Sequence, residues 1–144
     1  MIERIYTPKH SPVVSTMTIQ FKLAAIMLIV NQYKSISLMK IQLYLWGLQQ
    51  KENLQEILNW KTNNRITHVG WIDNEAVTEL VMQCVANKLL KLSLNNKVRV
   101  ELDTEANEFL FNIQNLDITK DIRADLERLG KVTDVLLKNI QFNF

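Results

Sequence analysis

The spacing of apolar residues changes at Leu90, and this change constrains the fold more than any other feature of the sequence. Starting at Asp73 or Asn74, apolar side chains recur at helical spacing: Val77, Leu80, Val81, Cys84, Val85 and Leu89. From Leu90 onward they occupy every second position: Leu90, Leu92, Leu94, Val98, Val100 and Leu102. Asn95-Asn96 lies between the two alternating runs and suits a two-residue hairpin turn, because Asn tolerates a positive φ. The sequence therefore predicts a helix, ending near Leu90, that leads directly into a β-hairpin with one apolar and one charged face.

The chain on either side of this unit is mostly helical in pattern. Three helices are expected before it: one from Ser15 or Thr16 to about Lys34, one from Leu38 to about Gln49 behind a Ser37 cap, and one from Glu52 to Trp60. Three are expected after it: one capped by Asp103 or Thr104, one capped by Thr119 and stopped by Gly130, and one capped by Thr133 that runs from Asp134 to about Gln141.

Two shorter segments do not read as helix. Residues 66–72 are rich in β-formers and bounded by Asn and Asp, which predicts a short strand or an extended segment. Residues 1–14 contain Pro8 and Pro12, both of which disfavour helix at the preceding residue. We therefore expect residues 1–14 to form an extended arm.

Taken together, these elements follow the order of a winged helix. We expect a mainly α protein with one β-hairpin, an α+β fold in which residues 15–144 form a winged-helix domain with extra C-terminal helices. The hairpin is the wing, and the helix from Asn74 to Leu90 occupies the position of the recognition helix. A chain of 144 residues suffices for one such core. An unrelated helical domain with a single hairpin is the alternative.

The charges do not favour direct reading of DNA by that helix. The first 72 residues hold 8 Lys/Arg and 3 Asp/Glu, whereas the last 72 hold 9 and 12, so the helix lies in the acidic half. Asp73, Glu75 and Glu79 would repel phosphates at its N-terminal end, although the helix dipole also favours carboxylates there. Candidate phosphate contacts on the hairpin are Lys91, Lys97 and Arg99. The same three residues are also compatible with an ordinary solvated strand face.

Composition and the absence of known motifs exclude several other classes of protein. The longest apolar run, Leu23 to Val30, would span about 12 Å as helix, so no membrane span is expected. A chain with a single Cys and two His has too few ligands for a structural zinc site and too few cysteines for a disulfide scaffold. Because a single Cys suits a reducing compartment, we expect a cytoplasmic location. There is no Gly-rich phosphate loop, HExxH, CxxC or GxSxG motif. We therefore expect no enzyme, no cofactor and no metal, and we interpret Cys84 as a core residue.

Aromatic and apolar residues point to a protein partner. The first two helices carry more apolar faces than a single small domain easily covers, and aromatic side chains are favoured at the cores of interfaces. Most of the aromatic residues are also expected in the core. Candidate interface residues are Trp46, Trp60, Trp71, Phe142 and Phe144.

The order and character of several segments resemble the small middle components of ABC-type three-component systems, which include the Lamassu-like defence modules. The segments that carry the resemblance are Phe21–Val30, Lys40–Leu45, Ala76–Leu90, Val100–Leu110 and Leu129–Thr133. The resemblance implies a non-catalytic accessory subunit that bridges a coiled-coil ATPase of the chromosome-maintenance type and an effector nuclease, in bacterial antiphage or antiplasmid defence. It implies DNA binding through the assembly and only weak binding by this chain alone. The alternative is a winged-helix transcriptional regulator that binds DNA directly.

Overall fold

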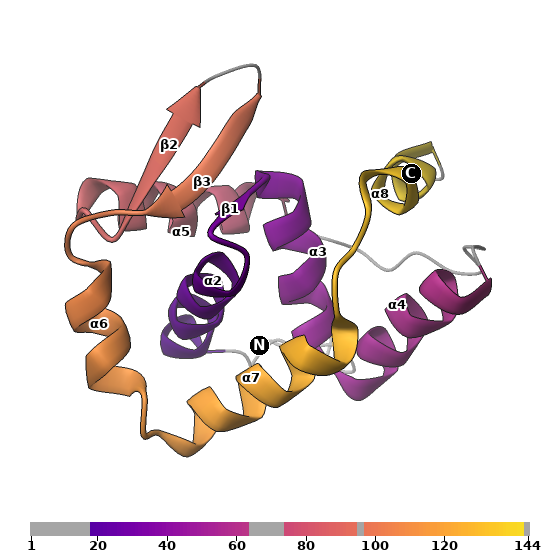
Figure 1. Ribbon diagram of the computed structural model, residues 1–144, viewed down its shortest axis with the longest axis horizontal. Helices are drawn as coiled ribbons and strands as arrows, with labels where there is room; N and C mark the ends of the chain where they lie inside the picture. Colours follow the sequence, from indigo (N-terminus) through magenta and orange to yellow (C-terminus); the bar gives the residue numbers. More distant parts are fainter. Residues whose placement is uncertain (1–17, 64–73, 95–96, 143–144) are drawn as a thin grey trace, which may run out of the picture.

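The computed structural model describes residues 18–63, 74–94 and 97–142 of the chain (Figure 1). These residues form a mainly helical structure with a small antiparallel sheet of three strands. In chain order the elements are α2 (Ile19–Tyr33), β1 (Ser35–Ile36), α3 (Leu38–Gln49), α4 (Lys51–Asn63), α5 (Asn74–Ala86), β2 (Leu90–Leu94), β3 (Val98–Leu102), α6 (Ala106–Ile113), α7 (Asp117–Leu129) and α8 (Asp134–Phe142).

Helix α2 is the centre of the molecule. Every residue from Ala24 to Val30 is buried, and the helix contacts α3, α6, α7 and β3 (Figure 1). A helix that is apolar on all sides is stable only when every side is covered, and here other parts of the same chain cover it. Its N-cap is Thr18, whose Oγ1 accepts a hydrogen bond from the Phe21 N–H at 3.1 Å, rather than Ser15 or Thr16.

Helix α3 is buried almost as completely and packs on α4. The residues from Ile41 to Leu48 are all buried, and the Trp46 and Trp60 rings stack with centroids 5.7 Å apart. A Cβ added at Gly47 would lie 2.7 Å from Ile57 Cδ1, so the absence of a side chain there permits the close approach of the two helices. Over Ala24–Val30 and Ile41–Leu48, the expectation that the first two helices leave apolar faces uncovered is thus wrong, because α4, α7 and the sheet supply the cover. At the start of α2, Ile19 is 61% exposed.

The hairpin forms as expected, but three residues rather than the predicted two separate the paired ends of its strands, Leu94 and Val98. Leu90 pairs with Leu102, Leu92 with Val100 and Leu94 with Val98, so the apolar residues share one face of the sheet. A third strand, β1, adds to the other side of β3, giving the order β1-β3-β2. Arg99 holds β1 in place by donating from Nε to Ser35 Oγ at 2.8 Å and from one Nη to the Ser35 carbonyl at 2.7 Å.

Several helices differ from the expected ends. Helix α4 runs to Asn63 instead of ending at Trp60. Helix α5 ends at Ala86 instead of near Leu90, because Lys88 turns the chain with a φ of +61° before β2 begins. Helix α7 begins at Asp117, so Thr119 is not its cap. The Thr119 hydroxyl is buried and donates instead to the Ile113 carbonyl at 2.7 Å, which ties α7 to the end of α6.

Other boundaries follow the sequence pattern closely. Helix α3 has the expected bounds and the Ser37 cap, and Thr133 Oγ1 accepts from the Leu136 N–H at the start of α8. Gly130 is the C-cap of α7, as expected. The cap of α6 is Glu105 rather than Asp103 or Thr104, and it forms no side-chain cap bond. The expected arm over residues 1–14 and the expected strand over residues 66–72 lie outside the described residues.

Candidate partner-binding surface

The apolar face of the hairpin is covered at one end and exposed at the other. Leu90 and Val100, near the helices, are fully buried. Toward the turn the exposed fraction rises, to 38% for Leu92, 52% for Val98 and 71% for Leu94. Leu94 and Val98 are paired across the two strands and so present their side chains next to each other. We call Leu92, Leu94 and Val98 the exposed hairpin face.

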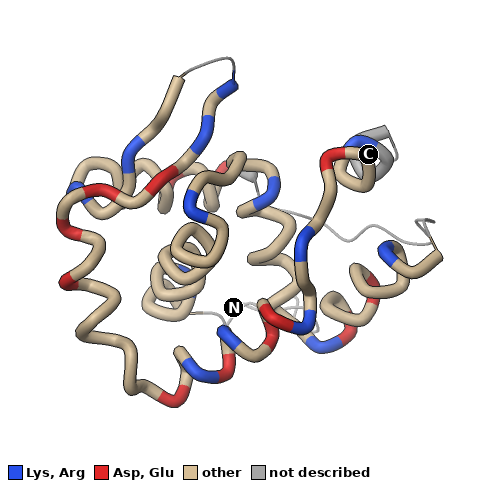
Figure 2. Tube along the Cα trace, viewed as in Figure 1, with Lys and Arg blue, Asp and Glu red and all other residues tan. Residues whose placement is uncertain are grey.

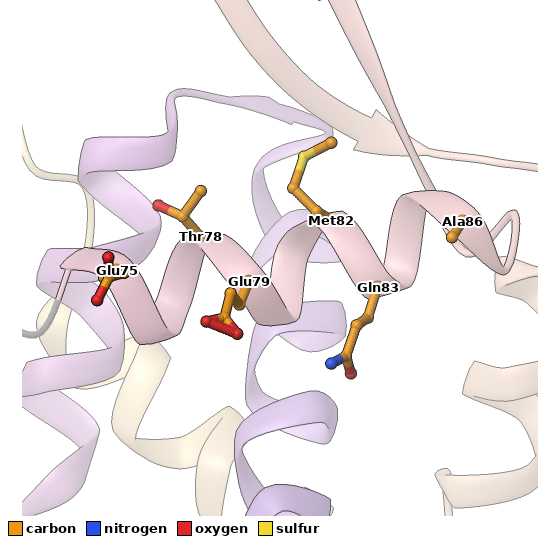
Figure 3. Close-up of a pocket in the computed structure, with 6 residues that line it drawn as sticks. All are labelled: Glu75, Thr78, Glu79, Met82, Gln83 and Ala86. Atoms are coloured by element: carbon orange, nitrogen blue, oxygen red, sulfur yellow. The ribbon is translucent and has the colours of Figure 1, made fainter.

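A shallow groove on α5 lies beside this hairpin, since α5 contacts β2. Six residues of the helix line it: Glu75, Thr78, Glu79, Met82, Gln83 and Ala86 (Figure 3). Met82 is 46% exposed and extends from the side of α5 nearer the hairpin, whereas Glu79 and Gln83 extend from the other side (Figure 3). The groove therefore combines an apolar side chain with two exposed carboxylates, Glu75 and Glu79.

The three candidate phosphate contacts of the hairpin do not share one environment. Lys91 and Lys97 are exposed, and Figure 2 shows Lys or Arg on both strands of the hairpin. Arg99 is only partly exposed, and its guanidinium is engaged with Ser35 on β1. Only the two lysines are therefore placed to meet a ligand on the outside of the hairpin.

The candidate aromatic interface is divided between the core and the undescribed residues. Trp46 and Trp60 are 8% and 1% exposed, and their stacked rings belong to the α3–α4 contact. They offer no surface to a partner in this structure. Phe142 is the last residue of α8, and Trp71 and Phe144 lie outside the described residues. Several apolar side chains face solvent elsewhere, among them Ile19, Phe111 and Val135. The exposed hairpin face differs in grouping three such side chains on two paired strands, and the sequence pattern could not separate it from the buried part of the same strands.

Cys84 is the group whose chemistry the structure defines best. This residue of α5 is 1% exposed and belongs to the core, and burial raises the pKa of its thiol to about 11. The thiol is therefore protonated at neutral pH and is not an activated nucleophile. Within the described ranges no three His, Cys, Asp or Glu side chains gather as metal ligands would. No helix among the described residues is both long and apolar enough to cross a bilayer.

Comparison with protein-family models, with curated proteins and with solved structures gave no match to this chain. Its class is therefore defined by the structure alone, as a mainly helical domain with a three-stranded antiparallel sheet, an acidic helix face and a partly exposed apolar hairpin.

Proposed function

We propose that this chain is a winged-helix interaction subunit that binds a protein partner through its hairpin and α5. The observation that carries the proposal is the exposed hairpin face, where Leu92, Leu94 and Val98 meet solvent side by side. The order α2-β1-α3, then α5-β2-β3, with β3 central in the sheet, supports the winged-helix assignment. In that assignment β2 and β3 form the wing, and α4 is an addition between the second and third helices of the motif.

The surface chemistry favours a protein over DNA as the direct ligand. Full burial of one leucine side chain contributes roughly 1.5–3 kcal/mol, and Leu94 is 71% exposed. DNA offers few apolar groups to cover such a surface. Glu75 and Glu79 on α5 would meet the phosphates of a duplex placed against the helix with like charge. A protein segment with apolar anchors and a basic residue fits both features.

The resemblance to the middle components of ABC-type three-component systems suggests which partners these are. We propose a coiled-coil ATPase of the chromosome-maintenance type and an effector nuclease, bridged by this chain in the bacterial cytoplasm during antiphage or antiplasmid defence. The role we propose is non-catalytic. DNA would then be bound by the assembly.

Co-expression with the products of the genes on either side of its own tests this function. We expect a stable complex that survives gel filtration and that Leu94→Ser weakens. Leu116→Ser is the matched control, because Leu116 is 49% exposed but lies at the start of α7, away from the hairpin. A wild-type chain that elutes as a monomer and ignores both neighbours would overturn the proposal.

Direct DNA binding is the second candidate, and the exposed Lys91 and Lys97 favour it. A transcriptional regulator would bind duplex DNA with an affinity that falls steeply with salt. Removing either lysine should reduce the slope of log K against log[salt] by about 1. Lys120→Gln, on α7, is the control with the same change of charge. No binding of a duplex at low salt would remove this candidate.

A further inference from the structure

A cavity of about 280 Å³ lies where four separate segments of the chain meet. They are the junction of α2 and β1, helix α3, strand β3, and the link between α7 and α8. Three of the residues that line the cavity are cationic: Lys40, Arg99 and Lys131. Figure 2 shows Lys and Arg on each of the last three segments. Residues as distant in sequence as Lys40 and Lys131 are thus brought to one concave site.

We propose that this cavity binds a phosphate or diphosphate group. Pockets for drug-sized ligands have volumes of roughly 300–1,000 Å³, so a volume just below this range suits a small anion. The flexible Lys side chains and the Arg fork are the groups that recognise phosphate oxygens most strongly, through charge-assisted hydrogen bonds. The hydroxyl-bearing residues Tyr33 and Ser35 line the same cavity and add polar surface.

Two of the cationic residues already have partners, yet they retain hydrogen-bond donors for a ligand. Arg99 uses two of its five N–H groups on Ser35 among the described residues. Lys40 pairs with Asp134 at 2.9 Å, and Asp134 is 66% exposed at its side chain. The described residues that line the cavity include three cations and no carboxylate, and Asp134 offsets only the charge of Lys40 beside it. The remaining surplus of positive charge attracts a multiply charged anion. Asp134 is a competitor of that anion for Lys40.

A hydrogen-bond network fixes the wall of the cavity. The hydroxyls of Tyr33 and Tyr44 both donate to the Gly130 carbonyl, at 3.0 and 2.8 Å. The Tyr44 hydroxyl also accepts from the buried Val132 N–H at 2.9 Å. These bonds hold the segment that bears Lys131 against α2 and α3. The backbone around the site is thus already in place, which lowers the entropic cost of binding.

Isothermal titration calorimetry with sodium pyrophosphate, inorganic phosphate and ADP at matched ionic strength tests the proposal. We expect saturable binding of pyrophosphate that weakens about fivefold in Lys40→Gln and in Lys131→Gln, as the loss of one partly solvated cation predicts. Lys120→Gln, an exposed lysine on α7 that does not line the cavity, should bind as the wild type does. Asp134→Asn should bind more tightly, because it frees Lys40 from its carboxylate.

The ligands also separate the sources of the phosphate. Equal affinity for pyrophosphate and ADP would show that the phosphate group is sufficient, and tighter binding of ADP would show that a nucleoside contributes. No saturable binding of any of the three at millimolar concentration would overturn the proposal. It would equally fail if the Lys40 and Lys131 variants bound as the wild type. Leu94→Ser should leave pyrophosphate binding unchanged, so this test is independent of the proposed partner surface.

Discussion

Gly130 ends α7 in a backbone conformation that only glycine adopts readily. Its φ is +64° and its ψ is −165°, a region in which a Cβ clashes with the backbone. The conformation matters because the Gly130 carbonyl accepts hydrogen bonds from both Tyr33 and Tyr44. A single residue therefore sets the direction in which the chain leaves α7 toward α8.

We predict that Gly130→Ala lowers the free energy of unfolding by about 1–3 kcal/mol, the usual cost of a residue held in such a region. The added Cβ would also lie 2.9 Å from Lys61 Nζ. The Lys61 ammonium donates to the Leu129 carbonyl, but it is the end of a flexible side chain and can move at the cost of that bond, whereas the backbone strain cannot relax. Urea denaturation of the two chains measures the difference.

A Lys61→Ala background separates strain from steric contact. In that background the ammonium is absent, and Gly130→Ala should still destabilise by a similar amount. If the second substitution had no effect there, contact with Lys61 would be the cause and the backbone argument would be wrong.

An ion pair between Lys40 and Asp134, at 2.9 Å, joins α3 to the start of α8. The hydrogen bond and the charge of Lys40 lower the pKa of Asp134 below its ordinary value of 3.8. A carboxyl whose pKa is lower in the folded state stabilises the fold above its unfolded pKa and loses this effect as the pH falls through the folded value. Because Asp134 is largely exposed, the contribution is small.

We predict that Asp134→Asn is slightly less stable than the wild type at neutral pH, by less than about 1 kcal/mol. The difference should vanish when the pH falls well below 3.8, where the wild-type carboxyl is also neutral. Urea midpoints measured at the two pH values give the comparison. A difference of the same size in acid would mean that the pair does not act through its charge.

The elements with strong local signals were predictable from the sequence. Helix α3 has a Ser37 cap and clear periodicity, and the hairpin alternates on both sides of Asn95-Asn96. Strand β1 was not predictable, because two residues carry no period. It forms through pairing with β3 and the hydrogen bonds of Arg99, a residue 64 positions away from Ser35. Only the tertiary fold brings these groups together.

The candidate sites were less predictable than the fold, for the same reason. Leu90, which is fully buried, and Leu94, which is 71% exposed, belong to the same alternating pattern. The pattern therefore cannot show at which residue of the strand burial by the helices ends. Trp46 was a candidate interface residue because it is aromatic and lies on a helix with several apolar faces. The structure packs this helix on α4 and stacks Trp46 on Trp60. The basic cavity likewise joins residues that no sequence spacing connects.

The described parts of the molecule share one core built around α2. This helix contacts α3, α6, α7 and β3, and α3 in turn contacts α4 and α5. Each of these helices therefore relies on its neighbours to bury its apolar side chains. A domain of this size with one continuous core is expected to unfold in a single cooperative transition.

Two internal reporters lie in different parts of that core and test its cooperativity. Cys84 reports on α5, and the Trp46–Trp60 pair reports on the α3–α4 contact. In a Trp71→Phe variant, we predict that Cys84 labelling by a thiol reagent and the tryptophan fluorescence change share one urea midpoint. The native thiol should be inert, because it is 1% exposed and its pKa is about 11, whereas the unfolded thiol returns to an ordinary value near 9.0.

A Cys84→Ala variant provides the background for the labelling signal and should keep the fluorescence transition two-state. If Cys84 became reactive at a lower urea concentration than the fluorescence midpoint, α5 and the hairpin would unfold as a separate unit. The partner-binding surface would then rest on a part of the chain less stable than its core. Coincident transitions instead mean that the exposed hairpin face is held by the whole fold, because β3 packs on α2 and β2 packs on α5.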